Sequence, residues 1–132
     1  MEFDIELGMT AKLTHTVQHA DTAHALDSSL PKVYSTPRLT ALIELASYKI
    51  IKPHLPSGYS AVGTIVNLKH LAATPVGMKV WAISTVVGID RRRISFRVEA
   101  FDEKEKIGET EHERFIIESE KFSKKTYEKA DT

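Results

Sequence analysis

Three polar residues in this sequence are of types that could together hydrolyse an ester or a thioester. Thr36 stands at the start of an apolar-periodic segment, Glu44 follows eight residues later in "LIELA", and His70 directly precedes "LAATPVG". A carboxylate can attack a carbonyl carbon or hold a water for that attack, and a histidine can move protons near neutral pH. A hydroxyl beside the free N–H groups of a helix N-terminus can hold a carbonyl oxygen.

Each of these residues also has an ordinary structural explanation. A lone Glu on a helix most often faces solvent, and a Thr before a helix is most often its N-cap. A strand histidine such as His70 is more often a residue with a satisfied hydrogen bond than a catalyst, and the same holds for His112 in "THER". If the helix is wrapped by a sheet, however, Glu44 faces a cleft or a partner subunit. The residue types alone leave both interpretations open.

Two further groups of polar residues are candidates for ligand binding. His15, His19 and His24 are four and five residues apart, a spacing that needs a helix, whereas the segment around His15 alternates like a strand. No acidic or thiol ligand completes the set, so no metal site is expected. The "RRR" run at 91–93 is either a solvated turn or a contact for an anionic ligand, because arginine binds phosphate bidentately.

One strong helix must position Thr36 and Glu44. Ser35 or Thr36 can cap it, Pro37 suits its first turn, and its apolar residues recur at helical spacing: Leu39, Leu42, Ile43, Ala46 and Ile50. Before it, residues 11–18 alternate as a strand, and Asp21 or Thr22 could cap a short helical turn through Ala25.

Four strand-like segments follow the helix, at 59–73, 77–90, 91–102 and 106–119, and the short polar breaks between them indicate antiparallel neighbours. One helix among five strands must bury its apolar face against the sheet. The expected fold class is therefore α+β, with an antiparallel five-stranded sheet curved around one long central helix. The alternative is a four-strand meander with the helix lying flat.

Composition narrows the class of protein further. The chain has 132 residues, 42% of them hydrophobic, no cysteine, and equal numbers of Lys+Arg and Asp+Glu, 18 each. This balance favours neither nucleic acid nor a membrane surface as a partner. One domain over residues 1–122 with a polar tail at 123–132 is expected, in the cytoplasm, since neither a signal peptide nor a membrane span is visible. Open sheet edges favour a two-fold dimer, with pairing of dimers into a tetramer left open.

Four stretches resemble the hotdog-fold thioesterases, and among them the fluoroacetyl-CoA thioesterase-like branch: "STPRLTALIELA", "AVGTIVNLKHLAATPVG", "VEAFDEKEKIGE" and "THERFII". The resemblance covers roughly residues 10–122. It implies the hotdog fold and a Thr–Glu–His set that hydrolyses acyl-CoA thioesters at a dimer interface. The matching positions are Thr36, Glu44 and His70.

The resemblance also implies residues that bind the substrate. Gly63 and Arg114 match family positions that help to place the acyl group. Tyr34 is the only aromatic residue where the fluoroacetyl-specific enzyme carries phenylalanines, so specificity for fluoroacetate is not implied. The phosphates of coenzyme A need cations, for which Lys106 and the arginines at 91–93, Arg91 first, are candidates. Coenzyme A enters as part of the substrate, and no separate cofactor is expected.

Alternatives remain within this interpretation. The nucleophile is either Glu44 itself or a water that Glu44 holds, and Glu44 and His70 are expected to matter more than Thr36. Bulky Tyr48 and Trp81 are expected to line the site, which together with the resemblance favours a small acyl group. A non-catalytic acyl-CoA-binding protein is the main alternative function, and a purely structural dimer is a third.

Overall fold

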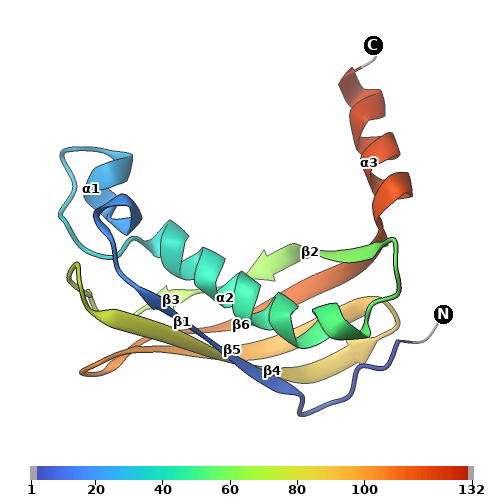
Figure 1. Cartoon of the computed structure of the whole chain (residues 1–132), viewed down its shortest axis with the longest axis horizontal. Coiled ribbons are helices and arrows are strands. Elements are labelled where there is room, and N and C mark those ends of the chain that lie inside the picture. Colours follow the sequence, from blue (N-terminus) through green and yellow to red (C-terminus); the bar gives the residue numbers. More distant parts are fainter. Residues whose placement is uncertain (1–2, 131–132) are drawn as a thin grey trace.

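A long helix lies along the inner face of a curved antiparallel sheet (Figure 1). The computed structural model describes residues 3–130. The sheet holds β1 (Thr10–Thr16), β4 (Lys79–Asp90), β5 (Arg93–Asp102), β6 (Lys106–Glu118) and β2 (Tyr59–Val66) in that order, and the two-residue β3 (Lys69–His70) also pairs with β6. The predicted curved sheet around one helix is confirmed, and the flat meander is wrong.

The central helix α2 (Thr36–Ile51) begins as the sequence predicts. The Ser35 hydroxyl accepts a hydrogen bond from the Arg38 N–H at 3.2 Å, so Ser35 is the N-cap and Thr36 the first helical residue. Pro37 occupies the first turn, where the missing N–H has no helical partner to lose. All five predicted apolar residues are buried, and so are Ser47 and Ile51, which makes the buried face wider than the predicted stripe.

The strands use their period of two to build the core. Along β4 and β5 buried and exposed side chains alternate, and the inner ones pack against α2. Ser47 of the helix and Ser84 of β4 meet in this core with their hydroxyl oxygens 2.8 Å apart, and the Ser47 hydroxyl also donates to the Ile43 carbonyl. Both buried hydroxyls are thereby satisfied, which removes most of the cost of burying them.

The segment predicted as one strand over residues 59–73 is broken after Val66. The Asn67 N–H bonds to the Glu111 carbonyl at 3.3 Å and to the Thr110 hydroxyl at 3.0 Å, and β3 resumes pairing with β6 only at Lys69. This break is why the sheet has six strands rather than the five predicted. A register shift between Gly63 and Ile65 also places a bulge in β2.

Two short helices lie at opposite ends of the molecule (Figure 1). The four-residue α1 (Ala23–Leu26) is capped by the Thr22 hydroxyl, one of the two predicted caps. At the other end α3 (Ser119–Tyr127) continues from β6 and projects away from the sheet, and none of its residues is buried. The candidate catalytic residues lie on the elements between these ends, Thr36 and Glu44 on α2 and His70 on β3.

Candidate active site

Thr36 and His70 meet at the N-terminus of α2. The Thr36 hydroxyl oxygen lies 2.8 Å from Nδ1 of His70, although the two residues are 34 positions apart. The helix start fixes the threonine, and pairing of His70 with Gly108 of β6 fixes the histidine backbone. The two side chains most directly suited to proton transfer and carbonyl binding are thus in hydrogen-bond contact.

His70 is held in a partly buried and electrically neutral setting. Burial is the largest influence on its pKa and lowers it below the ordinary value, with a smaller opposing effect from the backbone at Ala72. The second ring nitrogen, Nε2, is buried and has no hydrogen-bond partner among the described residues. A buried nitrogen without a partner is costly, so Nε2 marks a position where another polar group is expected.

An open hollow of about 320 Å³ lies beside this pair. Its lining combines Thr36 and His70 with small and apolar side chains from two segments: Ala23, Val33, Tyr34, Ser35, Leu71, Ala72 and Ala73. The hollow therefore offers two reactive groups beside a narrow apolar surface.

Glu44 belongs to a second cluster, around the bulge of β2. Its Oε1 lies 3.3 Å from Nη1 of Arg114, and Arg114 is the more buried of the two, with 11% of its side chain exposed against 36% for Glu44. A Cβ added to Gly63 would overlap Oε1 of Glu44 and lie 3.5 Å from the same Arg114 nitrogen. Only glycine leaves room for the carboxylate at this point.

The Arg114 guanidinium is fixed from several sides. Nη2 donates to the Ala61 carbonyl at 2.8 Å, Nη1 lies 3.4 Å from Nε2 of His112, and the Tyr48 ring lies 5.4 Å from the guanidinium carbon. Tyr48 thus contacts this cluster, and its predicted place in the lining of the site stays a prediction. His112 had no predicted role.

The two clusters do not meet within one chain. An α-helix rises 1.5 Å per residue, so the backbones of Thr36 and Glu44, which are eight positions apart, are separated by about 12 Å. Glu44 does not line the hollow beside Thr36 and His70. The structure thus joins Thr36 with His70, and Glu44 with Gly63 and Arg114, but it does not join the first pair with the second group.

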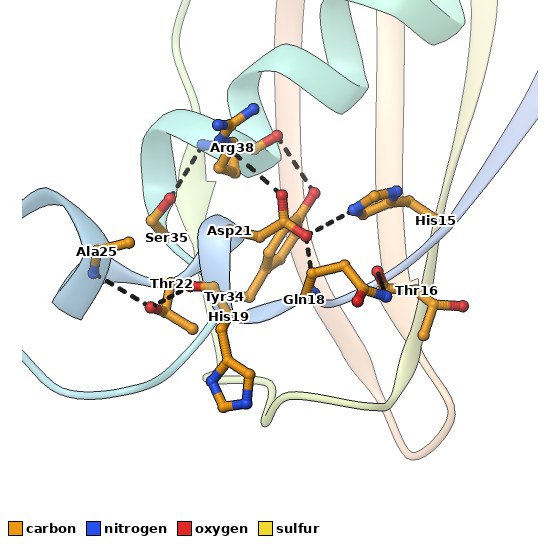
Figure 2. A network of polar contacts seen from close by, with 10 residues as sticks. All are labelled: His15, Thr16, Gln18, His19, Asp21, Thr22, Ala25, Tyr34, Ser35 and Arg38. Atoms are coloured by element: carbon orange, nitrogen blue, oxygen red, sulfur yellow. Dashed lines mark hydrogen bonds and ion pairs between the residues drawn. The ribbon is translucent and has the colours of Figure 1, made fainter.

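A buried carboxylate fastens the chain just before α2 (Figure 2). Asp21 lies between Nε2 of His15, 2.7 Å away, and the guanidinium of Arg38, 3.9 Å away, and it also accepts the Gln18 N–H. The Asp21 carbonyl accepts the N–H of Ser35, the helix cap. This network anchors the start of α2 and therefore the backbone that carries Thr36.

A buried Thr–Asp pair anchors the segment after His70. The Thr74 hydroxyl donates to Asp102 at 2.8 Å, and the Thr74 carbonyl accepts the Tyr34 N–H at 2.8 Å. Burial raises the pKa of Asp102, but hydrogen bonds from Lys104 N–H and from Thr74 outweigh it and the net pKa is lowered. Thr74 thus links the chain after His70 to the chain before Thr36, a role that the sequence did not reveal.

No three His, Cys, Asp or Glu side chains come together as a metal site within residues 3–130. Likewise, none of the helices in that part of the chain is long and apolar enough to cross a membrane.

Comparison with known proteins decides the family. The family model of fluoroacetyl-CoA-specific thioesterases matches residues 17–120. The fluoroacetyl-CoA thioesterase of Streptantibioticus cattleyicolor is 34% identical over 114 residues, which cover 86% of this chain and 82% of that protein. The chain belongs to the fluoroacetyl-CoA-specific thioesterase family.

Solved structures agree with this family. A structure of the fluoroacetyl-CoA thioesterase superimposes with a TM-score of 0.91 at 30% identity, covering 95% of this chain and 97% of the other. A thioesterase superfamily member from Thermus thermophilus gives a TM-score of 0.89 at 28% identity, covering 96% and 94%. The predicted hotdog fold and the predicted enzyme class, a thioester hydrolase, are confirmed.

The chain departs from the phenylalanine-bearing family enzyme in the segment before α2. Tyr34, the only aromatic residue there, is 2% exposed, and its hydroxyl donates to the Arg38 carbonyl at 3.2 Å. Tyr34 lines part of the hollow although its side chain is buried. The large apolar side chains that are exposed in this segment are those of Leu26 and Leu30.

The predicted cations are spread over separate places. Lys106 contacts Glu109 at 2.7 Å and Glu99 at 2.8 Å, and these bonds, that of Glu109 foremost, raise its pKa. Arg91 is an exposed turn residue with φ of 58°, beside a hollow of about 400 Å³ that it shares with its neighbours Asp90, Arg92, Arg93 and Phe115. Neither group reaches the Thr36–His70 hollow within one chain.

Trp81 is the one predicted lining residue that the structure places elsewhere. It lies on β4 between the buried Val80 and Ala82, so its side chain points to the outer face of the sheet, where it stacks on Phe101 at 6.1 Å. The prediction that Trp81 lines the site is wrong, because strand alternation assigns it to the face away from α2.

Proposed function

We propose that this protein hydrolyses the thioester of a small acyl-CoA to the free acid and coenzyme A, using Thr36, Glu44 and His70. We further propose a two-fold dimer in which Glu44 of the partner subunit approaches the Thr36–His70 pair. The observation that carries the proposal is the 2.8 Å contact between Thr36 and His70, with Nε2 of His70 buried and unpartnered among the described residues.

Two features support a site shared between copies. The separation of about 12 Å along α2 keeps Glu44 from His70 of its own chain, although both belong to the proposed set. β2, which carries Gly63, is the last strand of the sheet, and its outer edge pairs with no strand among residues 3–130. A second copy that adds its own β2 to this edge would satisfy the open backbone groups, and a two-fold axis repeats each contact.

The mechanism follows from the acceptor and donor roles of His70. When the Thr36 hydroxyl donates to Nδ1, the neutral ring carries its proton on Nε2, and a carboxylate is the natural acceptor for it. Glu44 of the partner subunit would hold the ring and stabilise the charge that develops when His70 takes a proton. The one hydrogen of the Thr36 hydroxyl is directed at Nδ1, and the Ser35 and Arg38 N–H groups already have acceptors. The backbone N–H of Thr36, in the first turn of α2, would therefore hold the carbonyl oxygen.

Hydrolysis needs one water for each thioester. The water oxygen bonds to the carbonyl carbon while a proton of that water passes to His70. The carbon–sulfur bond then breaks and releases the thiolate, which takes a proton. Because Arg114 already bonds to Glu44, we favour the route in which the carboxylate assists rather than attacks. Single-turnover hydrolysis in water enriched in the heavy oxygen isotope distinguishes assistance by Glu44 from direct attack by Glu44. Label found in the Glu44 carboxylate would establish direct attack through a mixed anhydride.

A small acyl group and a coenzyme A arm are the proposed substrate parts. Mutants of the related fluoroacetyl-CoA thioesterase were solved with fluoroacetate, with fluoroacetate and coenzyme A, and with acetyl-CoA. Small side chains such as Ala72 and Ala73 in the hollow suit a short acyl group. Gly63 and Arg114 are proposed to place it, with Tyr34 in the wall of the hollow and with Arg91 and Lys106 near the phosphates.

A panel of acyl-CoA thioesters, followed by thiol release, tests the proposed function. We expect turnover of short acyl groups and a loss of about 100- to 10,000-fold in Glu44→Gln and His70→Ala. Thr36→Ala should lose more than Thr36→Ser, which keeps the hydroxyl. Coenzyme A binding without turnover would favour the non-catalytic acyl-CoA-binding protein, and equal turnover by the variants would refute the assigned site.

A pair of substrates with and without the nucleotide tests whether Arg91 binds the phosphates of coenzyme A. Arg91→Glu should raise KM for an acyl-CoA but leave KM for the acyl-pantetheine, which lacks the nucleotide, unchanged. The same rise for both substrates would show that Arg91 does not act on the phosphates. Lys32→Glu provides a control charge reversal on an exposed residue in the segment before α2.

A further inference from the structure

His112 is a deeply buried ionisable side chain near the proposed site. It lies on β6 with 2% of the residue exposed, and its ring stacks on Phe96 with centroids 5.7 Å apart. A ring this deeply buried cannot touch a substrate. Any effect of His112 on the reaction must therefore pass through its neighbours.

The hydrogen bonds of His112 define which nitrogen carries its proton. Nδ1 lies 2.8 Å from the Ile65 carbonyl oxygen, and a carbonyl can only accept, so Nδ1 bears the hydrogen. In the neutral ring Nε2 then offers a lone pair, and Nη1 of Arg114 lies 3.4 Å from it. The two contacts are compatible only with the neutral Nδ1–H tautomer, because a protonated ring would turn an N–H toward the guanidinium.

Burial and the adjacent Arg114 keep this ring neutral. Burial is the largest influence and lowers the pKa of His112, and the positive charge of Arg114 lowers it further. The Ile65 hydrogen bond and the carboxylates of Glu44 and Glu113 oppose this shift but do not overcome it. At neutral pH the ring is thus a fixed hydrogen-bond acceptor for Arg114.

Arg114 passes this orientation on to Glu44. Its Nη2 is held by the Ala61 carbonyl, and its Nη1 lies between Nε2 of His112 and Oε1 of Glu44. Because the guanidinium is planar, holding two of its nitrogens fixes the direction of every N–H. His112 and Arg114 also hold carbonyls on either side of the β2 bulge, which keeps Gly63 beside the Glu44 carboxylate.

We propose that His112 is a positioning residue that fixes the Glu44 carboxylate through Arg114 and the bulge of β2. Its kinetic consequence rests on the proposed function, but the tautomer and the contacts do not. The role differs from packing alone, because it depends on one lone pair directed at one arginine. Removal of that arginine should therefore make the lone pair irrelevant.

A double-mutant cycle separates positioning from packing. We expect His112→Asn to lower kcat at least about tenfold with little change in KM, because Asn keeps a donor for Ile65 but offers no acceptor at the Nε2 position. In an Arg114→Met background the same substitution should lower kcat less than about twofold. Equal losses in both backgrounds would mean that His112 acts independently of Arg114, and would overturn the proposal.

Controls and a second variant guard against misfolding. His24→Asn is the matched control, since His24 also bonds a backbone carbonyl through Nδ1, with Leu30, but is only half-buried and belongs to neither cluster of the proposed site. It should keep wild-type kcat. His112→Gln, which can place an acceptor near Arg114, should retain more activity than His112→Asn. The reverse order among folded variants would contradict the proposal.

NMR of the ring nitrogens tests the inference without any enzyme activity. In the wild-type protein at about pH 7.5, His112 should show a protonated Nδ1 and an unprotonated Nε2. A protonated Nε2, whether in the other tautomer or in the imidazolium, would overturn the proposal. A protein with this tautomer but no thioesterase activity would refute the proposed function instead.

Discussion

Replacement of Gly63 by alanine should separate catalysis from folding. The added Cβ would overlap Oε1 of Glu44 and would otherwise make ordinary contacts, 3.4 Å to Cδ of Glu44 and 3.5 Å to Nη1 of Arg114. The single atom that must move is the end of a flexible side chain. Glu44 can swing away without disturbing the backbone, but its carboxylate then leaves the position that Arg114 fixes.

The two consequences of Gly63→Ala differ in size. Alanine in a strand gains about 0.5–1 kcal/mol over glycine, and loss of a contact to a carboxylate this exposed costs about 0.5–1 kcal/mol, so folding stability should change by less than about 1 kcal/mol. A catalytic group displaced by about 1 Å can cost about 100-fold in rate, equivalent to about 2.7 kcal/mol in the activation free energy. Catalysis should therefore fall far more than stability.

Thiol release and chemical denaturation measure these two quantities. Gly88→Ala is the matched control, because Gly88, like Gly63, is next to a register shift, and its added Cβ would meet only Ser95, at 3.2 Å. The control should keep wild-type turnover. If Gly63→Ala folds like the wild type and its turnover stays within about twofold, the position of Glu44 is not needed and the proposed site is refuted.

Two further predictions use pKa directions, and a third uses a buried hydrogen bond. Because burial lowers the pKa of His70 and its neutral form is the proposed base, kcat/KM should be level above about pH 6.5 and fall below it; a fall that begins well above this pH in a pH–rate profile would contradict the assignment. His112 has its pKa lowered in the same direction, so protons bind the unfolded chain more tightly, and the free energy of unfolding should decrease as pH falls below about 6.5; denaturation curves at two pH values show whether it rises instead. Thr74→Val removes the donor to Oδ2 of the buried Asp102 and should cost about 1–3 kcal/mol of stability, largely restored in Thr74→Ser; equal stability of the valine and serine variants would show that the hydrogen bond contributes nothing.

Much of the fold could be predicted from the sequence because the hydrophobic periodicity agreed with the residues that begin and end helices and strands. The helix start at Ser35–Thr36–Pro37 and the strand before "TPVG" could be predicted from local chemistry. The break at Asn67 could not, because the hydrogen bonds that divide the predicted strand come from Thr110 and Glu111, more than 40 residues away. Cross-strand bonds of this kind leave no local signal.

The site was predictable in its residues but not in its grouping. The types of Thr36, Glu44 and His70 suggested chemistry, while the contact of Thr36 with His70 and the separation of Glu44 depend on tertiary packing. The signal for His112 was present but unused. His112 and Arg114 alternate with the acidic residues of the outer face, which assigns both to the inner face of the sheet.

The same alternation could have excluded Trp81 from the site. Its neighbours Val80 and Ala82 have the inner parity of β4, so the tryptophan must point outward. Bulk alone suggested that it lined the site, and strand parity was the stronger argument.

The central claim is that Glu44 of one subunit completes the Thr36–His70 pair of the other, and subunit complementation tests it most directly. Glu44→Gln and His70→Ala chains, each inactive alone, are co-expressed with different tags and the mixed dimer is purified. In a shared site one of the two sites of that dimer is unaltered, so the mixed dimer should recover about half of the wild-type turnover. Each site would carry one substitution if both residues came from the same chain, and a folded mixed dimer without recovered activity would contradict the shared site.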